Sequence, residues 1–284
     1  MEKQTSVCIL VPVFNRKHYT IPFIESIQKQ SFRDYKLIII DDGSTDGTSA
    51  EIKEKYPDVD IIFGDGNWWW TKSIVEGITY SKDKYGPRYY LLLNDDLEVK
   101  ADYINSFIKK ANAHNEIQCS LGVNIENHAE TIIPGHIFNQ YTGLFRLPKN
   151  MDETQVPNFC LPGRGLFFSA EILKKTMFDS KQFPQTCGDY DFTYSAKING
   201  GKAIINTEAK VYYYVNETST KKYFNQYSYL MLKYYITEIK SSCAFKTIYN
   251  FNKKHVQHGF ITVSILLGVS KCILGYVFRW INIK

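Results

Sequence analysis

Four short apolar runs alternate with helix-like segments in the first hundred residues, and this alternation constrains the fold more than any other feature. The apolar runs lie at residues 6–14, 35–40, 59–63 and 89–93. The helical patterns between them lie at residues 20–30, 48–56 and 71–82. Runs of β-branched and other apolar residues are typical of strands buried on both faces. Strands that alternate with helices predict βαβ crossovers and therefore a largely parallel sheet.

The second half of the chain is less regular. Helical patterns occupy residues 101–113, 170–175 and 190–198, and strand-like patterns occupy residues 119–125, 166–169, 203–206 and 210–215. A loop-rich stretch covers residues 132–148. We find no internal repeat and no low-complexity linker. We therefore expect one domain over residues 1–216 and a separate tail over residues 217–284.

The tail is basic and the body is not. From Glu217 onward the chain has ten Lys and Arg residues and two acids, which gives this part a net charge of +8. Because the net charge of the whole chain is +5, residues 1–216 carry −3. A nucleic-acid groove would spread basic residues through the body, so we expect no nucleic-acid partner. Only the tail is predicted to meet an anionic surface.

The end of the tail, residues 259–281, is apolar and about long enough to span a membrane. Its polar and small residues fall on one helical face, namely Ser264, Gly268, Lys271, Gly275 and Arg279. Lys271 at a bilayer centre would cost roughly 2.5–3.5 kcal/mol. A helix in the interfacial plane avoids this cost, with Lys253, Lys254, Arg279 and Lys284 near anionic headgroups. Packing on the domain, packing on a second subunit of a homo-oligomer, and a true span remain alternatives.

The six cysteines are scattered, with no CxxC pair and no Cys/His cluster. This spacing argues against a structural zinc site and against a disulfide framework. Reduced thiols and a polar start at residues 1–6, with no visible signal peptide, predict a cytoplasmic protein. Together with the tail, they predict a peripheral location at the inner face of the cell membrane.

Two pairs of acids follow strands without a break. Asp41 and Asp42 follow the second apolar run, and Asp95 and Asp96 come just after the fourth. Ligands of open parallel sheets bind beyond the carboxyl ends of the strands. Clustered carboxylates are usually held by a cation or by hydrogen-bond donors of a ligand. The pairs therefore indicate a ligand site, and solvated turns are the alternative.

The motifs around these acids resemble those of family 2 glycosyltransferases of the GT-A fold, of the bacterial surface-glycan type. They run in order as VPVFN at residues 11–15, IIIDDGSTDGT at 38–48, GDGNWWW at 64–70, LLLNDDLEV at 91–99, LPGRG at 161–165 and GDYDF at 188–192. The resemblance covers roughly residues 6–215. It implies an α/β fold with a mixed, mostly parallel sheet flanked by helices, followed by a C-terminal helical extension.

The resemblance also implies a site for a nucleoside diphosphate sugar carrying UDP, GDP or dTDP, in residues 1–100. The residues that it assigns to donor binding are Pro12, Phe14, Asp41, Asp42, Asn67, Trp69, Trp70, Asn94, Asp95 and Arg164. The triplet that corresponds to the family's DxD motif, at residues 94–96, makes Asp96 the ligand of a Mg²⁺ or Mn²⁺ ion. Packing of the Trp rings under the sheet edge, and a plain surface turn at Arg164, are the alternatives.

Residues 101–216 are the implied acceptor and catalytic half. By resemblance Asp189 is the general base, with Asp191 as the alternate and helix capping as the structural alternative. Attack opposite the diphosphate would invert the anomeric centre. This chain departs from the family pattern at three places: Asn94 replaces an acid, Ser195 and Lys197 stand where an Arg is common, and tyrosines at residues 212–214 replace a His.

The sequence therefore predicts a glycosyltransferase that acts on a surface-glycan or lipid-linked acceptor. A non-catalytic nucleotide-sugar or glycan-binding module on the same fold is the alternative. The replacement of an acid by Asn94 is the feature that favours it. A nucleotidyltransferase is disfavoured because residues 14–18 lack the glycine of a phosphate loop.

Overall fold

The computed structural model describes residues 5–111, 114–155, 158–214, 221–224 and 226–282. The strands of the first half are β1 (Val7–Val13), β2 (Tyr35–Asp41), β3 (Asp60–Phe63), β4 (Tyr89–Leu92), β5 (Glu98–Val99) and β6 (Glu116–Asn124). The later strands are β7 (Thr131–Ile132), β8 (His136–Phe138), β9 (Phe145–Arg146), β10 (Phe159–Cys160), β11 (Leu166–Ser169) and β12 (Lys202–Tyr213). The helices are α1 (Lys17–Gln28), α2 (Thr48–Lys55), α3 (Trp69–Tyr85), α4 (Tyr103–Ile108), α5 (Gly188–Ile198), α6 (Tyr229–Thr237), α7 (Phe245–His255) and α8 (Ile261–Asn282).

The main sheet is mixed and mostly parallel in its first half, as predicted. Its strand order is β3-β2-β1-β4-β11-β6-β12-β5, with β7 paired to β6 at the side. Strands β1 to β4 pair in parallel, and β11 enters antiparallel between β4 and β6. A second, small sheet has the order β10-β8-β9.

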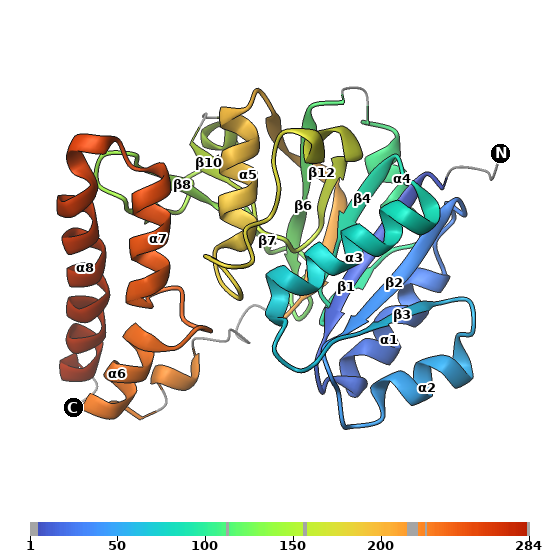
Figure 1. The fold of residues 1–284 in the computed structure, drawn as a ribbon, viewed down its shortest axis with the longest axis horizontal. Helices are drawn as coiled ribbons and strands as arrows, with labels where there is room; N and C mark the ends of the chain where they lie inside the picture. Colours follow the sequence, from blue (N-terminus) through green and yellow to red (C-terminus); the bar gives the residue numbers. More distant parts are fainter. Residues whose placement is uncertain (1–4, 112–113, 156–157, 215–220, 225, 283–284) are drawn as a thin grey trace.

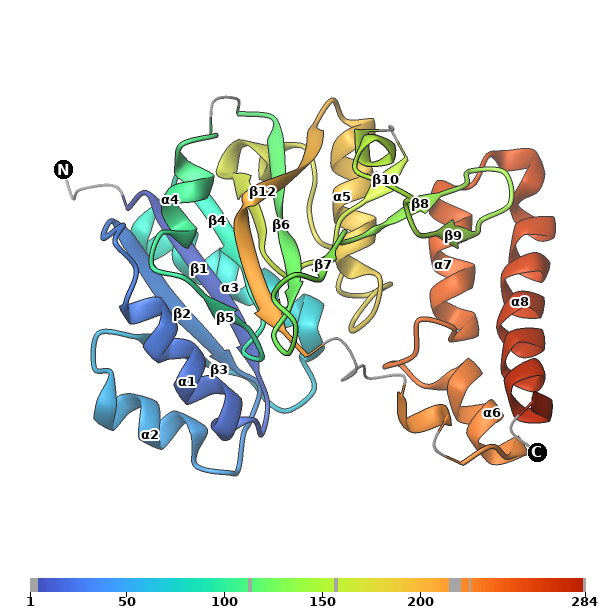
Figure 2. The ribbon, with the colours of Figure 1, turned by 180° about the vertical axis from the view of Figure 1, so that it is seen from behind.

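Helices cover both faces of the main sheet (Figures 1 and 2). Alternate residues of β1 point to opposite faces because side chains alternate along a strand. Ile9 and Val11 belong to the same buried cluster as Ile24 of α1. Leu10 belongs to the cluster that contains Ile74 of α3. Burial on both faces explains why the first runs are almost wholly apolar.

Several predicted boundaries were wrong. Helix α1 covers Lys17–Gln28, whereas the sequence predicted a helix over residues 20–30. The helix predicted at residues 101–113 is only the short α4, with 112–113 outside the described residues. The strands predicted at 203–206 and 210–215 are one strand, β12, whose register with β6 shifts between Asn206 and Lys210. A bulge of this kind looks like a turn in the sequence. Residue 215 lies outside the described part.

The C-terminal helices α6, α7 and α8 form a layer beside α5, at the end of the molecule opposite α1 and α2 (Figure 1). Phe251 of α7 joins a buried cluster with Phe138, Phe183 and Tyr194, which anchors this layer to the small sheet and to α5. The predicted domain boundary at residues 216–217 lies outside the described residues, so it stays a prediction.

Part of the α8 face that carries small and polar residues packs on the protein, whereas Lys271, Gly275 and Arg279 of this face are exposed. Ser264 and Gly268 are buried, and an added Cβ on Gly268 would lie 2.9 Å from Ile248 of α7. Along the rest of its surface α8 exposes large apolar side chains, namely Val263, Leu266, Leu267, Leu274, Phe278 and Ile281. Packing on the protein, one of the alternatives, therefore coexists with an outward apolar face.

Candidate active site

The loop after β2 uses both of its acids as hydrogen-bond acceptors. Asp41 accepts hydrogen bonds from the Ser44 backbone N–H at 2.8 Å and from the Ser49 hydroxyl. Asp42 accepts backbone N–H bonds of 2.9 Å from Gly66, Trp68 and Trp69. Both carboxylates are buried. The contacts of the Asp42 carboxylate hold the loop after β3 against the loop after β2, and the contacts of the Asp41 carboxylate stay within the segment that follows β2.

Asp42 also fixes an unusual backbone conformation at the start of α3. Trp69 has φ 57°, a left-handed conformation that costs a bulky residue about 1–2 kcal/mol. The Asp42 carboxylate binds the N–H groups of Trp68 and Trp69 through one oxygen, which offsets this strain. Gly64 is required beside it, because an added Cβ would lie 2.5 Å from Asp42 Oδ1. Strained backbone of this kind clusters at functional sites.

The acids after β4 lie around a guanidinium group that the sequence did not single out. Asp95 is buried, accepts a 2.9 Å bond from the Thr20 hydroxyl and lies 3.3 Å from Arg16 Nε. Asp96 Oδ2 accepts a 2.9 Å bond from Arg16 Nη2. Burial raises the pKa of Asp95 to about 6, although the charge of Arg16 opposes this rise. Arg16 therefore links the end of β1 to the residues after β4.

Asp96 keeps one carboxylate oxygen available for a ligand. Its Oδ1 atom is buried and has no hydrogen-bond partner among the residues that the structure describes. No group of three or more His, Cys, Asp or Glu side chains that could hold a metal exists in the described part of the chain. A hard divalent cation takes few protein carboxylates when phosphate and water complete its shell. The single free oxygen of Asp96 fits that limited role.

Asp189 lies in the first turn of α5, and two backbone N–H groups fix its carboxylate. Gly163 donates to Oδ2 at 2.8 Å, and Tyr190 donates to Oδ1 at 2.9 Å. The N-cap of α5 is Cys187, so Asp189 does not cap this helix. Burial raises the pKa of Asp189, and the two hydrogen bonds oppose that rise. The carboxylate is therefore rigidly placed and more basic than a solvated one.

A cavity of about 430 Å³, which we call the Asp189 cleft, brings four of the predicted site residues together. Trp70, Asn94, Arg164 and Asp189 line it. They come from α3, the loop after β4, the turn before β11 and α5, segments that are far apart in the sequence. Asp42 and Asp96 do not line this cavity. Asp96 lies two residues after Asn94, and Asp42 accepts a hydrogen bond from the backbone of Trp69, the residue before Trp70.

The turn at residues 161–165 shapes the Asp189 cleft. An added Cβ on Gly163 would lie 2.3 Å from Trp70 Cζ2, so only glycine fits against this ring. The Trp70 indole N–H donates to Asn94 Oδ1 at 3.3 Å. The Arg164 guanidinium lies 4.2 Å from the centre of the Tyr213 ring. Arg164 makes no ion pair with any residue in the described ranges, so its charge is available to a ligand.

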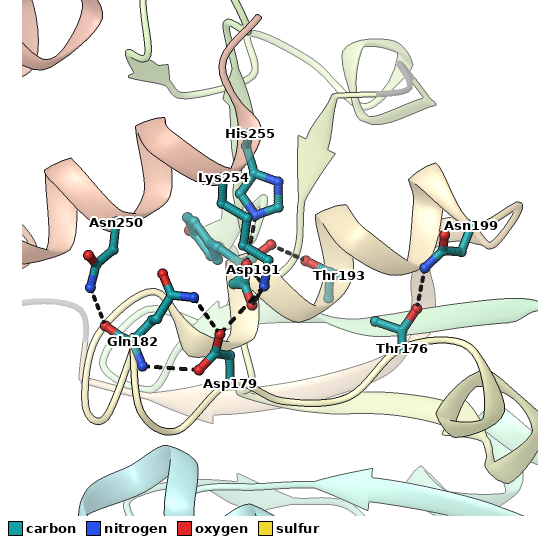
Figure 3. Close-up of polar contacts among 10 residues, drawn as sticks. Thr176, Asp179, Gln182, Asp191, Thr193, Asn199, Asn250, Lys254 and His255 are labelled. Atoms are coloured by element: carbon teal, nitrogen blue, oxygen red, sulfur yellow. Dashed lines mark hydrogen bonds and ion pairs between the residues drawn. The ribbon is translucent and has the colours of Figure 1, made fainter. Parts of the chain in front are cut away.

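Asp191, the alternate base, lies in a different environment. It is fully buried, and its carboxylate contacts His255 Nε2 at 2.6 Å and Lys254 Nζ at 2.8 Å (Figure 3). Both partners belong to α7, so the contacts fasten the C-terminal helices to α5. Asp191 lines neither the Asp189 cleft nor the neighbouring cavity between α5 and the helices α7 and α8. The two acids of the GDYDF motif therefore have different surroundings, and only Asp189 faces open space.

The remaining predicted donor residues lie near the same edge of the sheet but outside the lining of the Asp189 cleft. Pro12 is half-buried on β1, and Phe14 just beyond it is largely exposed. Asn67 is exposed in the loop before α3. Trp69 is half-buried and lies 5.4 Å below the ammonium of Lys240. Their donor-binding roles stay predictions.

A second cavity of about 620 Å³ lies between α5 and the helices α7 and α8, and we call it the helical cleft. It shares Asp189 with the first cavity and reaches Lys271 and Arg279 on α8. Sequence reasoning missed Lys240 and His136, which also line the Asp189 cleft. Neither residue belongs to a motif, and no spacing in the sequence indicates that they approach Asp189.

Comparisons with known proteins agree with this geometry. The family model described as Glycosyl transferase family 2 matches residues 8–173. One curated relative is the GalNAc(5)-diNAcBac-PP-undecaprenol beta-1,3-glucosyltransferase of Campylobacter jejuni, 26% identical over 182 residues. That match covers 62% of this chain and 53% of the relative, so the chain spans about half of the relative's length. Glycosyltransferase GlyG of Streptococcus pneumoniae is 36% identical over 50 residues, which are 18% of this chain and 16% of GlyG.

Solved structures share the fold at low sequence identity. The 1–349 fragment of S. aureus TarS in complex with UDP-GlcNAc has a TM-score of 0.57 at 14% identity, over 98% of this chain and 73% of that one. The mannosyltransferase PcManGT from Pyrobaculum calidifontis, in complex with GDP-Man and Mn²⁺, has a TM-score of 0.56 at 12% identity, over 99% and 75%. These likenesses confirm the GT-A fold. Because the family model matches more than half of its residues, this chain belongs to glycosyl transferase family 2.

Proposed function

We propose that this protein transfers a sugar from a nucleoside diphosphate donor to a hydroxyl group of a surface-glycan or lipid-linked acceptor, with inversion at the anomeric carbon. The observation that carries the proposal is the position of Asp189. Its carboxylate is held by Gly163 and Tyr190 in a cleft that Trp70, Asn94 and Arg164 also line. Family membership supports the same reaction class.

The chemistry requires a base on the acceptor and stabilisation of the leaving diphosphate. In our proposal the acceptor oxygen attacks the anomeric carbon from the face opposite the diphosphate, and its proton passes to Asp189. The bond between the anomeric carbon and the diphosphate oxygen breaks, so the charge collects on the diphosphate. The raised pKa of Asp189 suits a base. Arg164 and Lys240 line the cleft and carry the positive charge that a diphosphate needs.

We propose Asp96 as the protein's carboxylate ligand for Mg²⁺ or Mn²⁺. Its free Oδ1 atom supports this role, and two structural relatives are complexes with Mn²⁺. A bound ion would neutralise charge on the diphosphate. Arg16, which contacts Oδ2 of the same carboxylate, orients the group.

The donor and acceptor classes are supported by relatives. TarS is known with UDP-GlcNAc and PcManGT with GDP-Man, so we propose a UDP-, GDP- or dTDP-linked sugar. The Campylobacter relative is named for a glycan on a pyrophosphate-linked undecaprenol. We propose an acceptor of the surface-glycan or lipid-linked class on this basis.

We propose that α8 holds the protein at the inner face of the cell membrane. The stretch His258–Asn282 is long and apolar enough to cross a membrane, with a mean hydropathy of 1.9, and 17% of its most apolar window is buried in the protein. Its exposed face carries Leu266, Leu274 and Phe278. A helix with one protein-facing side and one apolar side fits the membrane surface. Lys284, predicted near the headgroups, lies outside the described residues, and homo-oligomerisation through the same face is the rival hypothesis.

A screen of nucleotide sugars with and without Mn²⁺ tests the function. We expect one donor to raise the melting temperature and to be hydrolysed slowly, with both effects stronger with Mn²⁺. Asp96→Asn should remove the Mn²⁺ dependence, and Asp65→Asn, which changes an exposed acid after β3, should not. Binding without hydrolysis for every donor would favour the non-catalytic module. Absence of binding for every donor would contradict the proposal.

A further inference from the structure

The helical cleft opens from the candidate active site toward α8. Both cavities are lined by His136, Pro162, Gln185, Thr186, Asp189 and Tyr190. The shared residues make the two cavities neighbours with a common wall at Asp189. A ligand in the helical cleft can therefore present one end to Asp189 and the other end to α8.

The α8 wall of this cleft carries two cations without anionic partners. The Lys271 ammonium donates to the Phe145 carbonyl at 3.2 Å, and the Arg279 guanidinium lies 4.7 Å from the centre of the Phe224 ring. Neither forms an ion pair with another residue in the described parts of the chain. Asp189 is the only carboxylate among the residues that line the two cavities. The helical cleft is therefore net positive and suits an anionic ligand.

The surface of α8 between Lys271 and Arg279 leaves space for a ligand. Lys271, Gly275 and Arg279 follow each other at intervals of four residues, so they lie along one face of α8. An added Cβ on Gly275 would meet no atom within 4 Å. Two turns of helix separate the cations by roughly 12 Å, and both long side chains can bend toward the space above Gly275. This arrangement is a cradle with a charge at each end.

The charge of Lys271 reaches the wall that the two cavities share. His136 lines both cavities, and its pKa is lowered first by burial and then by the charge of Lys271. His136 Nδ1 is also hydrogen-bonded to the Tyr190 hydroxyl at 2.6 Å, next to Asp189. The charge of Lys271 therefore acts on a residue of the wall that the two cavities share.

We propose that the helical cleft binds the phosphate or pyrophosphate group of the acceptor, with Lys271 and Arg279 as its charged contacts. This inference rests on the proposed function and names the acceptor class as a phosphate-linked lipid. The cations of the Asp189 cleft, Arg164 and Lys240, are left for the donor diphosphate. One protein surface thus holds two anions, and the acceptor sugar lies between them near Asp189.

The position of the cradle favours a lipid over a soluble phosphate compound. The same helix that carries Lys271 and Arg279 also exposes an apolar side with Leu274 and Phe278, three residues after Lys271 and one residue before Arg279. If that apolar side lies in the membrane surface, the two cations lie at the level of lipid phosphates. A phosphate-linked lipid could then enter the open side of the cleft from the membrane while its chain stays in the bilayer.

Calorimetric titration of the full chain with geranyl pyrophosphate, a short prenyl pyrophosphate, tests the inference. The double variant Lys271→Gln/Arg279→Gln should raise the Kd for this probe at least about tenfold and leave the Kd for UDP within about twofold. The matched control Lys233→Gln/Lys246→Gln changes two exposed cations of the same helical layer, outside both cavities, and should change neither Kd. The conservative variant Lys271→Arg/Arg279→Lys should retain binding.

Three results would overturn the inference. The first is that the Gln substitutions make no difference to the binding of geranyl pyrophosphate. This holds if the wild type does not bind the probe, or if the Gln variant, with an unchanged melting temperature, binds it as tightly as the wild type. The second is an equal rise in the Kd for UDP, which would assign the cations to the donor. The third is inorganic pyrophosphate that binds as tightly as geranyl pyrophosphate, which would indicate a soluble ligand. A failure of the proposed function is detected by a different measurement, because the wild-type protein would then bind no nucleotide sugar.

Discussion

The backbone N–H of Gly163 donates a 2.8 Å hydrogen bond to the Asp189 carboxylate. This bond joins the turn before β11 to the first turn of α5. The same glycine lies against the Trp70 ring, with no room for a Cβ. One residue therefore positions both the candidate base and an aromatic wall of the Asp189 cleft.

Gly163→Ala should disturb both contacts together. The added Cβ would lie 2.3 Å from Trp70 Cζ2, so the ring or the turn must move. We expect a loss of stability of about 1–3 kcal/mol and a fall in donor hydrolysis of at least about tenfold. Gly259→Ala is the control, because a Cβ there meets nothing within 4 Å. Wild-type hydrolysis by a folded Gly163→Ala protein would refute this role of the turn.

Asp191→Asn should weaken the attachment of the C-terminal helices. The buried carboxylate contacts Lys254 and His255 of α7 (Figure 3). We expect urea unfolding to show a loss of about 2–3 kcal/mol, below the usual cost of breaking a buried ion pair because Lys254 is one-third exposed. Donor hydrolysis by the folded fraction should stay within a few-fold of the wild type.

Asp179→Asn is the matched control, since Asp179 approaches Lys254 only to 3.9 Å and is partly exposed. Its cost should stay below about 1 kcal/mol. If Asp191→Asn were as stable as this control but inactive, Asp191 rather than Asp189 would be the base.

The fold was predictable because its signal is local. The strands β1 and β4 are continuous apolar runs, and the helices α1 and α3 bury apolar residues at helical spacing. The bulged strand β12 was not predictable, since residues 207–210 interrupt the apolar pattern while β12 continues beside β6. The local sequence pattern identifies a strand or helix, whereas the segments that pair with it in the fold determine where it ends.

The site was only partly predictable. The motifs located Trp70, Asn94, Arg164 and Asp189, because a family motif marks a position in the fold. The contacts of Asp191 with His255, of Arg16 with Asp95, and of Lys240 with Trp69 join residues 64, 79 and 171 positions apart. No spacing rule spans such distances. Pairings of this kind are decided by tertiary packing.

Asp95 should give the protein a characteristic pH dependence. Its pKa rises from the usual 3.8 to about 6, mainly through burial. Between these values the folded carboxyl keeps its proton and the unfolded one loses it, so stability falls as the pH rises from about 4 to about 6 and is then constant. The total change is about 3 kcal/mol.

Urea unfolding of Asp95→Asn and of the wild type across this pH range measures the effect. Asparagine does not titrate, so the variant should lack this part of the slope. Parallel pH profiles for the two proteins would contradict the raised pKa.

The exposed face of α8 should govern binding to membranes. Leu274→Gln/Phe278→Gln removes two exposed apolar side chains without a change in charge. We expect partitioning onto anionic vesicles to fall at least about tenfold in a sedimentation assay. Met177→Gln/Ile198→Gln changes exposed apolar residues away from the tail and should have no effect. Unchanged partitioning of the α8 variant, or a dimer that it dissociates, would favour the packing alternative.

The role of Asp189 is tested most directly by single-turnover hydrolysis of the donor, with UDP affinity measured in parallel. For Asp189→Asn we predict a fall in rate of about a hundredfold or more, with the Kd for UDP within about twofold of the wild type. Since burial raises the pKa of Asp189, the wild-type rate should also increase with pH through a value above the usual one for aspartate, and the variant should lack this increase. An Asp189→Asn protein that hydrolyses the donor at the wild-type rate would contradict the account.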